Sequence, residues 1–154
     1  MPDPVIKTID VPCPQDKAFA IFTSDFSIWW PRDKHSVSAM GGSPAKSVHL
    51  EPKSGGQISE IGHDGTTHIW GSVRVYDPSD RLSLLWHIGK PVAEATHVDV
   101  TFEPREGGTR VTLTHHGWDA LGDDGPRMRD GYNTGWVHVF ETCFANACKT
   151  GVDA

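Results

Sequence analysis

The strongest constraint on the fold is a change in hydrophobic periodicity near residue 125. Between residues 44 and 117 apolar and polar side chains alternate, most regularly over residues 96–103 and 109–115. Alternation with a period of two indicates strands with one covered and one solvated face, and therefore an antiparallel sheet. From residue 127 the apolar side chains repeat with the period of a helix instead. We therefore expect a sheet followed by one long helix over residues 127–149, about 35 Å in length.

Turn-forming sequences such as Asp64-Gly65 divide the strand-like region into separate strands. A β-branched segment near the N-terminus adds one more strand, and short helices follow it at Pro14 and after Ser24-Asp25. The expected strands are residues 5–11, 48–51, 57–61, 67–76, 81–88, 96–103 and 109–115.

Bulky aromatic residues lie at both ends of the chain, with the strand-like region between them. The adjacent Trp29 and Trp30 precede the strands, and Trp136 lies within the expected helix. This distribution suggests a sheet wrapped around the helix, with a pocket between them. Gly131 and Gly135 lower helix propensity by roughly 1 kcal/mol each relative to alanine, so we expect either a close neighbour or open space beside them.

Composition and charge limit the classes of partner. The chain of 154 residues fits one domain over residues 1–154, and its net charge of -6 argues against nucleic acid and anionic membranes. There is no apolar run of the roughly 20 residues that span a membrane, and the N-terminus lacks the pattern of a signal peptide. The three cysteines have no CxxC spacing, so we expect a reducing, cytoplasmic location.

Several motifs, taken in order, resemble one known family. They are VP at 11–12 followed by Phe19 and Phe22, WWP at 29–31, GSVRVYDP at 71–78, GTRVTLTHHGW at 108–118 and YNTGW at 132–136. The chain resembles the homologues of the activator of heat-shock-protein-90 ATPase, within the START-like (SRPBCC) superfamily. The resemblance implies an α+β helix-grip fold, in which a curved seven-stranded antiparallel sheet grips a long C-terminal helix across a cavity and two short helices follow the first strand. Members include lipid and hormone carriers, polyketide cyclases and protein-interaction domains.

A pocket in such a fold would be lined by inward apolar residues of the sheet and the helix. His115 shares the face of Val111 and Leu113, so we expect it to point inward, where it would contact a ligand or bond to a neighbouring backbone group or tryptophan. The candidate ligand-binding residues are Trp30, Val73, Leu84, Trp86, Val100, Phe102, Leu113, His115, Tyr132, Trp136 and Phe140.

Catalytic and metal-binding motifs are missing from the sequence. There is no HxH or HExxH spacing, nucleophile elbow, P-loop or GxGxxG motif. We therefore expect no metal and no cofactor, and we assign no catalytic residue.

Three functions are compatible with these features. The leading prediction is a domain that binds a small apolar or amphipathic molecule between sheet and helix. The second is an enzyme of the cyclase, dehydratase or hydrolase type, with His115 as acid or base and Tyr132 as donor to an oxyanion. The third, less favoured, is an interaction module with a chaperone partner. A homodimer is compatible with all three.

Overall fold

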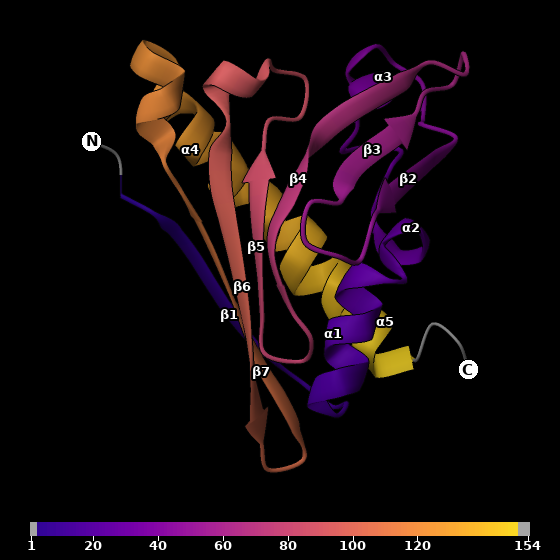
Figure 1. Ribbon diagram of the computed structural model, residues 1–154, viewed down its shortest axis with the longest axis vertical. Helices are drawn as coiled ribbons and strands as arrows, with labels where there is room; N and C mark the ends of the chain where they lie inside the picture. Colours follow the sequence, from indigo (N-terminus) through magenta and orange to yellow (C-terminus); the bar gives the residue numbers. More distant parts are fainter. Residues whose placement is uncertain (1–2, 151–154) are drawn as a thin grey trace.

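A single curled sheet organises the computed structural model, which describes residues 3–150 (Figure 1). All seven strands are antiparallel and follow the order β1-β7-β6-β5-β4-β3-β2. The strands are β1 (Val5–Val11), β2 (Ser47–Leu50), β3 (Gln57–Ile61), β4 (Thr67–Asp77), β5 (Arg81–Trp86), β6 (Thr96–Arg105) and β7 (Gly108–His116). Every predicted strand is confirmed, and each boundary lies within two residues of its prediction.

Local irregularities allow this sheet to curl. The pairing of β3 with β4 shifts register between Ile58 and Ser59, and that of β4 with β5 shifts between Val73 and Val75. Such bulges increase the twist and bend the bulged strand. At Gly71, β4 approaches β5 so closely that a Cβ atom would overlap the carbonyl oxygen of Leu85. The sheet therefore wraps around its own concave face.

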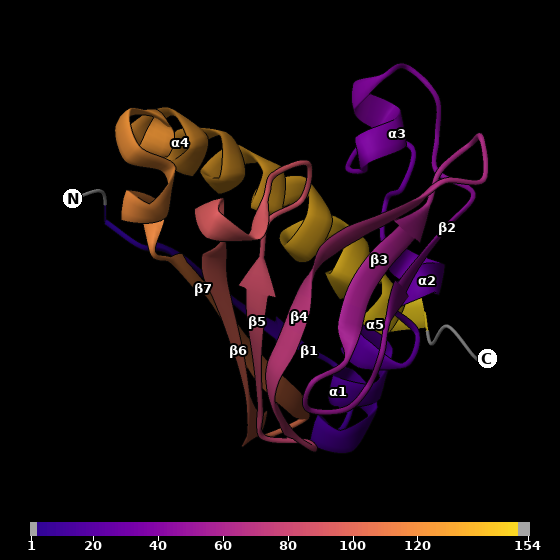
Figure 2. The same ribbon diagram turned by 45° about the horizontal axis from the view of Figure 1, so that its top comes forward.

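A nearly continuous helical segment fills that face (Figures 1 and 2). It comprises α4 (Gly125–Trp136), the π-helical η3 (Val137–Phe144) and α5 (Ala145–Thr150), which confirms the predicted long C-terminal helix. In η3 the wider winding lets the Ala145 N–H donate to the Phe140 carbonyl, five residues back. The helix-grip arrangement implied by the resemblance is thus present.

Short helical elements connect the strands. The predicted helices after the first strand are α1 (Gln15–Thr23) and α2 (Phe26–Trp29). Three further elements were not predicted from the sequence: α3 (Val37–Met40), η1 (Val92–Glu94) and η2 (Trp118–Asp124). Within residues 3–150, no helix has the length and hydropathy that a membrane span requires.

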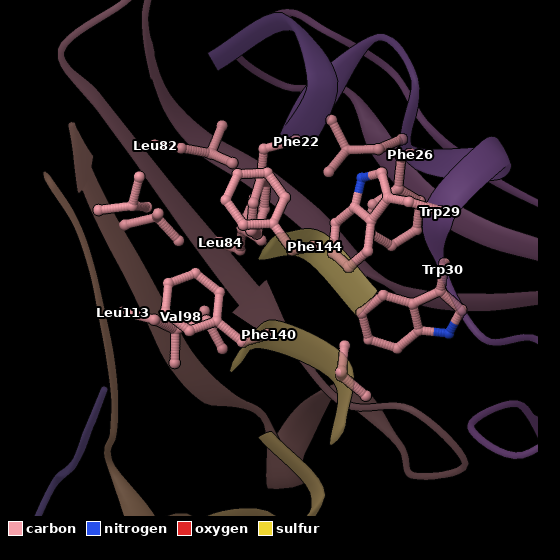
Figure 3. Close-up of a cluster of buried hydrophobic side chains, with 14 of the residues drawn as sticks. Phe22, Phe26, Trp29, Trp30, Leu82, Leu84, Val98, Leu113, Phe140 and Phe144 are labelled. Carbon is pink, nitrogen blue, oxygen red and sulfur yellow. The ribbon is translucent and has the colours of Figure 1, made fainter. Parts of the chain in front are cut away.

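Aromatic rings pack tightly where α1 and α2 meet the end of the helical segment (Figure 3). Phe144 lies edge-on to Phe22 and Trp29, with ring centroids 5.2 Å and 5.3 Å apart. Trp29 is only 6% exposed, and its indole N–H donates to the Ile21 carbonyl at 2.8 Å. This end of the interior is a solid core, and the site described next lies at the other end.

Candidate functional site

A pocket of about 390 Å³ opens beside α4, near the end of β5 and the segment that joins α2 to α3. This volume falls in the range that accommodates small molecules. The pocket is lined by Trp30, Lys34, His35, Met40, Trp86, Ile88, Arg127, Met128, Gly131, Tyr132, Gly135, Trp136 and Val139.

Two glycines of α4 create much of this space. A Cβ atom added at Gly131 would meet no atom within 4 Å, and one added at Gly135 would lie 3.7 Å from His35 Cε1. Glycine in a helix interior costs roughly 1 kcal/mol relative to alanine. The sequence left two explanations for this cost, and the structure shows open space beside Gly131 and a neighbouring side chain beside Gly135.

Three tryptophans form the inner wall of the pocket. The ring centroids of Trp30, Trp86 and Trp136 lie 5.7 to 6.1 Å from one another. Each indole N–H already has a partner in the protein: Trp30 donates to His35 O at 2.7 Å, Trp86 to the Tyr132 hydroxyl at 3.2 Å and Trp136 to His115 Nδ1 at 3.0 Å. The tryptophans therefore offer carbon surface to the pocket and keep their donors for the protein.

Tyr132 contributes the one neutral hydroxyl on the wall. Its oxygen accepts a hydrogen bond from Trp86, and its own proton has no acceptor among the described residues. Burial raises the pKa of Tyr132 to about 12, although the Trp86 N–H partly offsets this effect. The hydroxyl is therefore neutral near pH 7 and is available to donate to an acceptor in the pocket.

His115 lies behind this wall and does not line the pocket. The indole of Trp136 can only donate, so His115 Nδ1 accepts and the ring proton lies on Nε2. That proton is donated to Thr96 Oγ1 at 2.6 Å, and Thr96 in turn donates to the Trp86 carbonyl at 3.2 Å. Burial lowers the pKa of His115 to about 3, with smaller effects from the charges of His116 and His97. His115 is therefore a neutral residue that holds Trp136 in place.

The remaining candidates divide into two groups. Trp30, Trp86, Tyr132 and Trp136 meet around the pocket. The others are buried but lie among core side chains outside the pocket lining: Val73, Leu84, Val100, Phe102, Leu113 and Phe140.

Phe102 illustrates the second group, since its ring lies 5.2 Å from that of Phe19 and 6.2 Å from that of Phe22. Alternation along a strand identifies the covered face, but not which covered residues border empty space.

Sequence reasoning missed the segment at the pocket rim. Lys34, His35 and Met40 come from the region around α3, which carries no strong periodic signal. The fully buried Glu60 holds α3 in place: its carboxylate accepts from the N–H groups of Val37 (2.6 Å) and Ser38 (3.0 Å) and from the Trp70 indole (2.8 Å). An acid on the covered face of strand 57–61 was the available signal for such an anchor.

Metal binding has no candidate site among the residues described. Nowhere in residues 3–150 do three or more histidine, cysteine, aspartate or glutamate side chains converge closely enough to hold an ion. His35 lines the pocket and its ring centroid lies 5.6 Å from that of His138, but within residues 3–150 this pair belongs to no group of three or more possible ligands.

Known proteins resemble this chain over almost its whole length. The model of a family described as Activator of Hsp90 ATPase homolog 1-like protein matches residues 12–144. Among solved structures, the anthrahydroquino-γ-pyrone synthase Txn09 is 27% identical, with 95% of this chain and 99% of that chain covered and a TM-score of 0.62.

Two further structures share the fold at lower identity. The Aha1 dimer from Colwellia psychrerythraea is 18% identical (96% and 97% covered, TM-score 0.68). A protein from Chromobacterium violaceum is 14% identical (96% and 99% covered, TM-score 0.68). A search of curated proteins gives no match.

Proposed function

Because the chain belongs to the family of Activator of Hsp90 ATPase homolog 1-like proteins, we propose that it uses the pocket beside α4 to bind a small, flat and largely apolar molecule. The observation that carries this proposal is the wall formed by Trp30, Trp86 and Trp136, whose N–H groups all bond to the protein. Such a wall favours ring systems, because aromatic pairs gain about 0.5–1.5 kcal/mol beyond the burial of their area.

Polar recognition inside the pocket rests on one residue. The Tyr132 hydroxyl donates to a carbonyl or similar acceptor on the ligand, and the bond from Trp86 fixes its position. The name of the synthase that is 27% identical describes fused planar rings with oxygen substituents. A molecule of that kind would fit both the aromatic wall and the single donor.

The test uses a side chain that fills the pocket. Leucine in place of Gly131 enters the open space, whereas Thr134→Leu adds the same side chain on the exposed side of α4. The probe is the neutral dye N-phenyl-1-naphthylamine, which becomes fluorescent in apolar surroundings. We expect wild type and Thr134→Leu to bind the dye alike, and Gly131→Leu to bind it at least about tenfold more weakly.

Loss of dye binding by Gly131→Leu supports the pocket only if this variant is as stable as wild type. Leucine is a better helix former than glycine by up to about 1 kcal/mol, so Gly131→Leu should unfold at the same or a higher denaturant concentration than wild type. Loss of binding in a protein that is no less stable supports the pocket. Equal dye binding by Gly131→Leu and wild type would contradict the proposal.

A second candidate function is an enzyme of the cyclase, dehydratase or hydrolase type that uses the same pocket. The unused donor of Tyr132 favours it, since such a hydroxyl can stabilise developing oxyanion charge. His115 does not suit the role of acid or base, because both of its ring nitrogens are engaged. Replacing Tyr132 by phenylalanine should lower turnover of an accepted substrate by about 100-fold or more. Turnover unchanged in this variant would exclude the role.

Protein partners remain less favoured proposals. The solved relative from Colwellia psychrerythraea is described as a dimer, which keeps a homodimer among the proposals for this chain. The proposal of a chaperone partner is supported by the family name alone.

A further inference from the structure

The charged residues that line the pocket are both cations. Lys34 and Arg127 border it, and no aspartate or glutamate is found in its lining. The chain as a whole carries a net charge of -6, so this pair opposes the overall sign. Building on the function proposed above, we infer that the pocket selects flat molecules that bear an acidic oxygen, such as a phenolate, an enolate or a carboxylate, and holds that oxygen at the rim between Lys34 and Arg127.

Both cations are free to serve a ligand. Lys34 is exposed and forms no ion pair with any described residue. Arg127 lies 3.2 Å from Asp124, but the two side chains are 71% and 55% exposed, so water screens their attraction. A guanidinium has five N–H donors in a planar fork, and one carboxylate contact leaves most of them unused.

The inner surface explains why the acidic group would remain at the rim. An ionised oxygen buried against tryptophan carbon without a partner would lose its hydration at a high cost in free energy. His35 also lines the pocket, but burial, and then the charge of its neighbour His138, lower its pKa, so it adds no positive charge near pH 7. Long cationic side chains lay their methylene groups on apolar surface and keep the charge in water. The ligand would therefore enter with its rings first and leave its acid at the mouth.

A pair of dyes that differ in one group separates this inference from simple apolar binding. N-phenyl-1-naphthylamine is neutral, and 8-anilino-1-naphthalenesulfonate carries a sulfonate on the same ring system. The measured quantity is the ratio of the two dissociation constants. Only the part of each dye's fluorescence that is lost in Gly131→Leu is used, because that part comes from the pocket. Titrations at about 20 mM and about 200 mM salt report how much of the preference is electrostatic.

The variants are matched for charge. Lys34→Gln/Arg127→Gln removes both cations at the rim, and Lys46→Gln/Lys53→Gln removes two exposed cations that do not line the pocket. We expect the rim variant to lose about fivefold more affinity for the sulfonate than for the neutral dye at low salt, as exposed charge pairs allow. The control variant should keep the wild-type ratio.

Each other outcome counts against one specific claim. A ratio that is the same in wild type and the rim variant, or that falls equally in the control, would overturn the inference about acidic ligands and leave the pocket in place. If wild type binds neither dye in a manner that Gly131→Leu removes, the proposed function fails, and this inference fails with it.

Discussion

The two ends of the C-terminal helical segment use similar aromatic partners in opposite ways. In η3, the Phe140 and Phe144 rings stack almost parallel, with centroids 5.6 Å apart, and Phe144 also packs against Phe22 and Trp29 (Figure 3). In α4, the facing positions are glycines, and a pocket of about 390 Å³ remains. One end is a closed core and the other is a cavity, although tryptophans lie at both.

This difference shows that missing side chains on α4 contribute to the cavity. Protein interiors are close-packed, so a gap on a helix face is partly filled when neighbouring side chains can move into it. Here the three pocket tryptophans cannot easily do so, because each indole N–H is tied to a fixed partner. The pocket therefore depends on missing side chains on α4 and on hydrogen bonds that hold its aromatic wall.

The greatest loss of stability should come from a substitution at the closed end. Phe144→Ala removes a fully buried ring from a tightly packed cluster, so the free energy of unfolding should fall by about 3–5 kcal/mol. Urea denaturation measures this change, and binding of the neutral dye to the folded fraction should persist. A loss below about 1 kcal/mol would mean that this end is not closely packed.

A pH-dependent change in stability of intermediate size is expected from His115, which lies behind the pocket wall and holds Trp136. The unfolded chain protonates His115 near its ordinary pKa of 6.5, whereas the folded protein keeps it neutral down to about 3. The unfolded state thus binds more protons in this window, and stability falls as the pH is lowered, by about 1.4 kcal/mol per unit. This contribution is fully present above pH 6.5 and is lost progressively toward pH 3.

Replacement of His115 isolates that contribution from other titrating groups. Between pH 7 and pH 5, urea unfolding of the wild type should lose about 2 kcal/mol more than that of His115→Gln, or of His115→Asn if the first variant does not fold. Equal losses in wild type and variant would show that His115 titrates normally in the folded protein. The hydrogen bonds assigned to its neutral form would then be wrong.

The smallest effect has the opposite sign and comes from the open end. Gly131→Ala adds a methyl group that touches nothing, so it should stabilise the protein by about 1 kcal/mol through helix propensity alone. Gly135→Ala is the matched comparison, because its Cβ would only reach ordinary contact with His35 at 3.7 Å. Thermal unfolding of both variants measures the gain. A loss of stability in Gly131→Ala would show that the space beside α4 is filled.

Periodicity in the sequence predicted the elements better than it predicted the site. The strands at 96–103 and 109–115 alternate so regularly that the sheet and the inward position of His115 follow directly. The helix α3 was missed because it has four residues and depends on a distant anchor, the Glu60 carboxylate. Trp29 and Trp30 are adjacent in a turn, and the sequence carries no signal for which of the two faces the cavity. In the structure both are buried, and only Trp30 lines the pocket.

The spacing of apolar residues along the chain was enough to predict the sheet, the long helix and the covered faces of both. Gly131 and Gly135, which lower helix propensity, also indicated that the helix has either a close neighbour or open space at these positions. Which buried residues border a void follows only from the folded chain, since it depends on how side chains from α4, β5 and the segment before α3 meet. Likewise, His115 changed from a candidate ligand contact to a support for Trp136 because its partners, Thr96 and Trp136, are brought together only by folding.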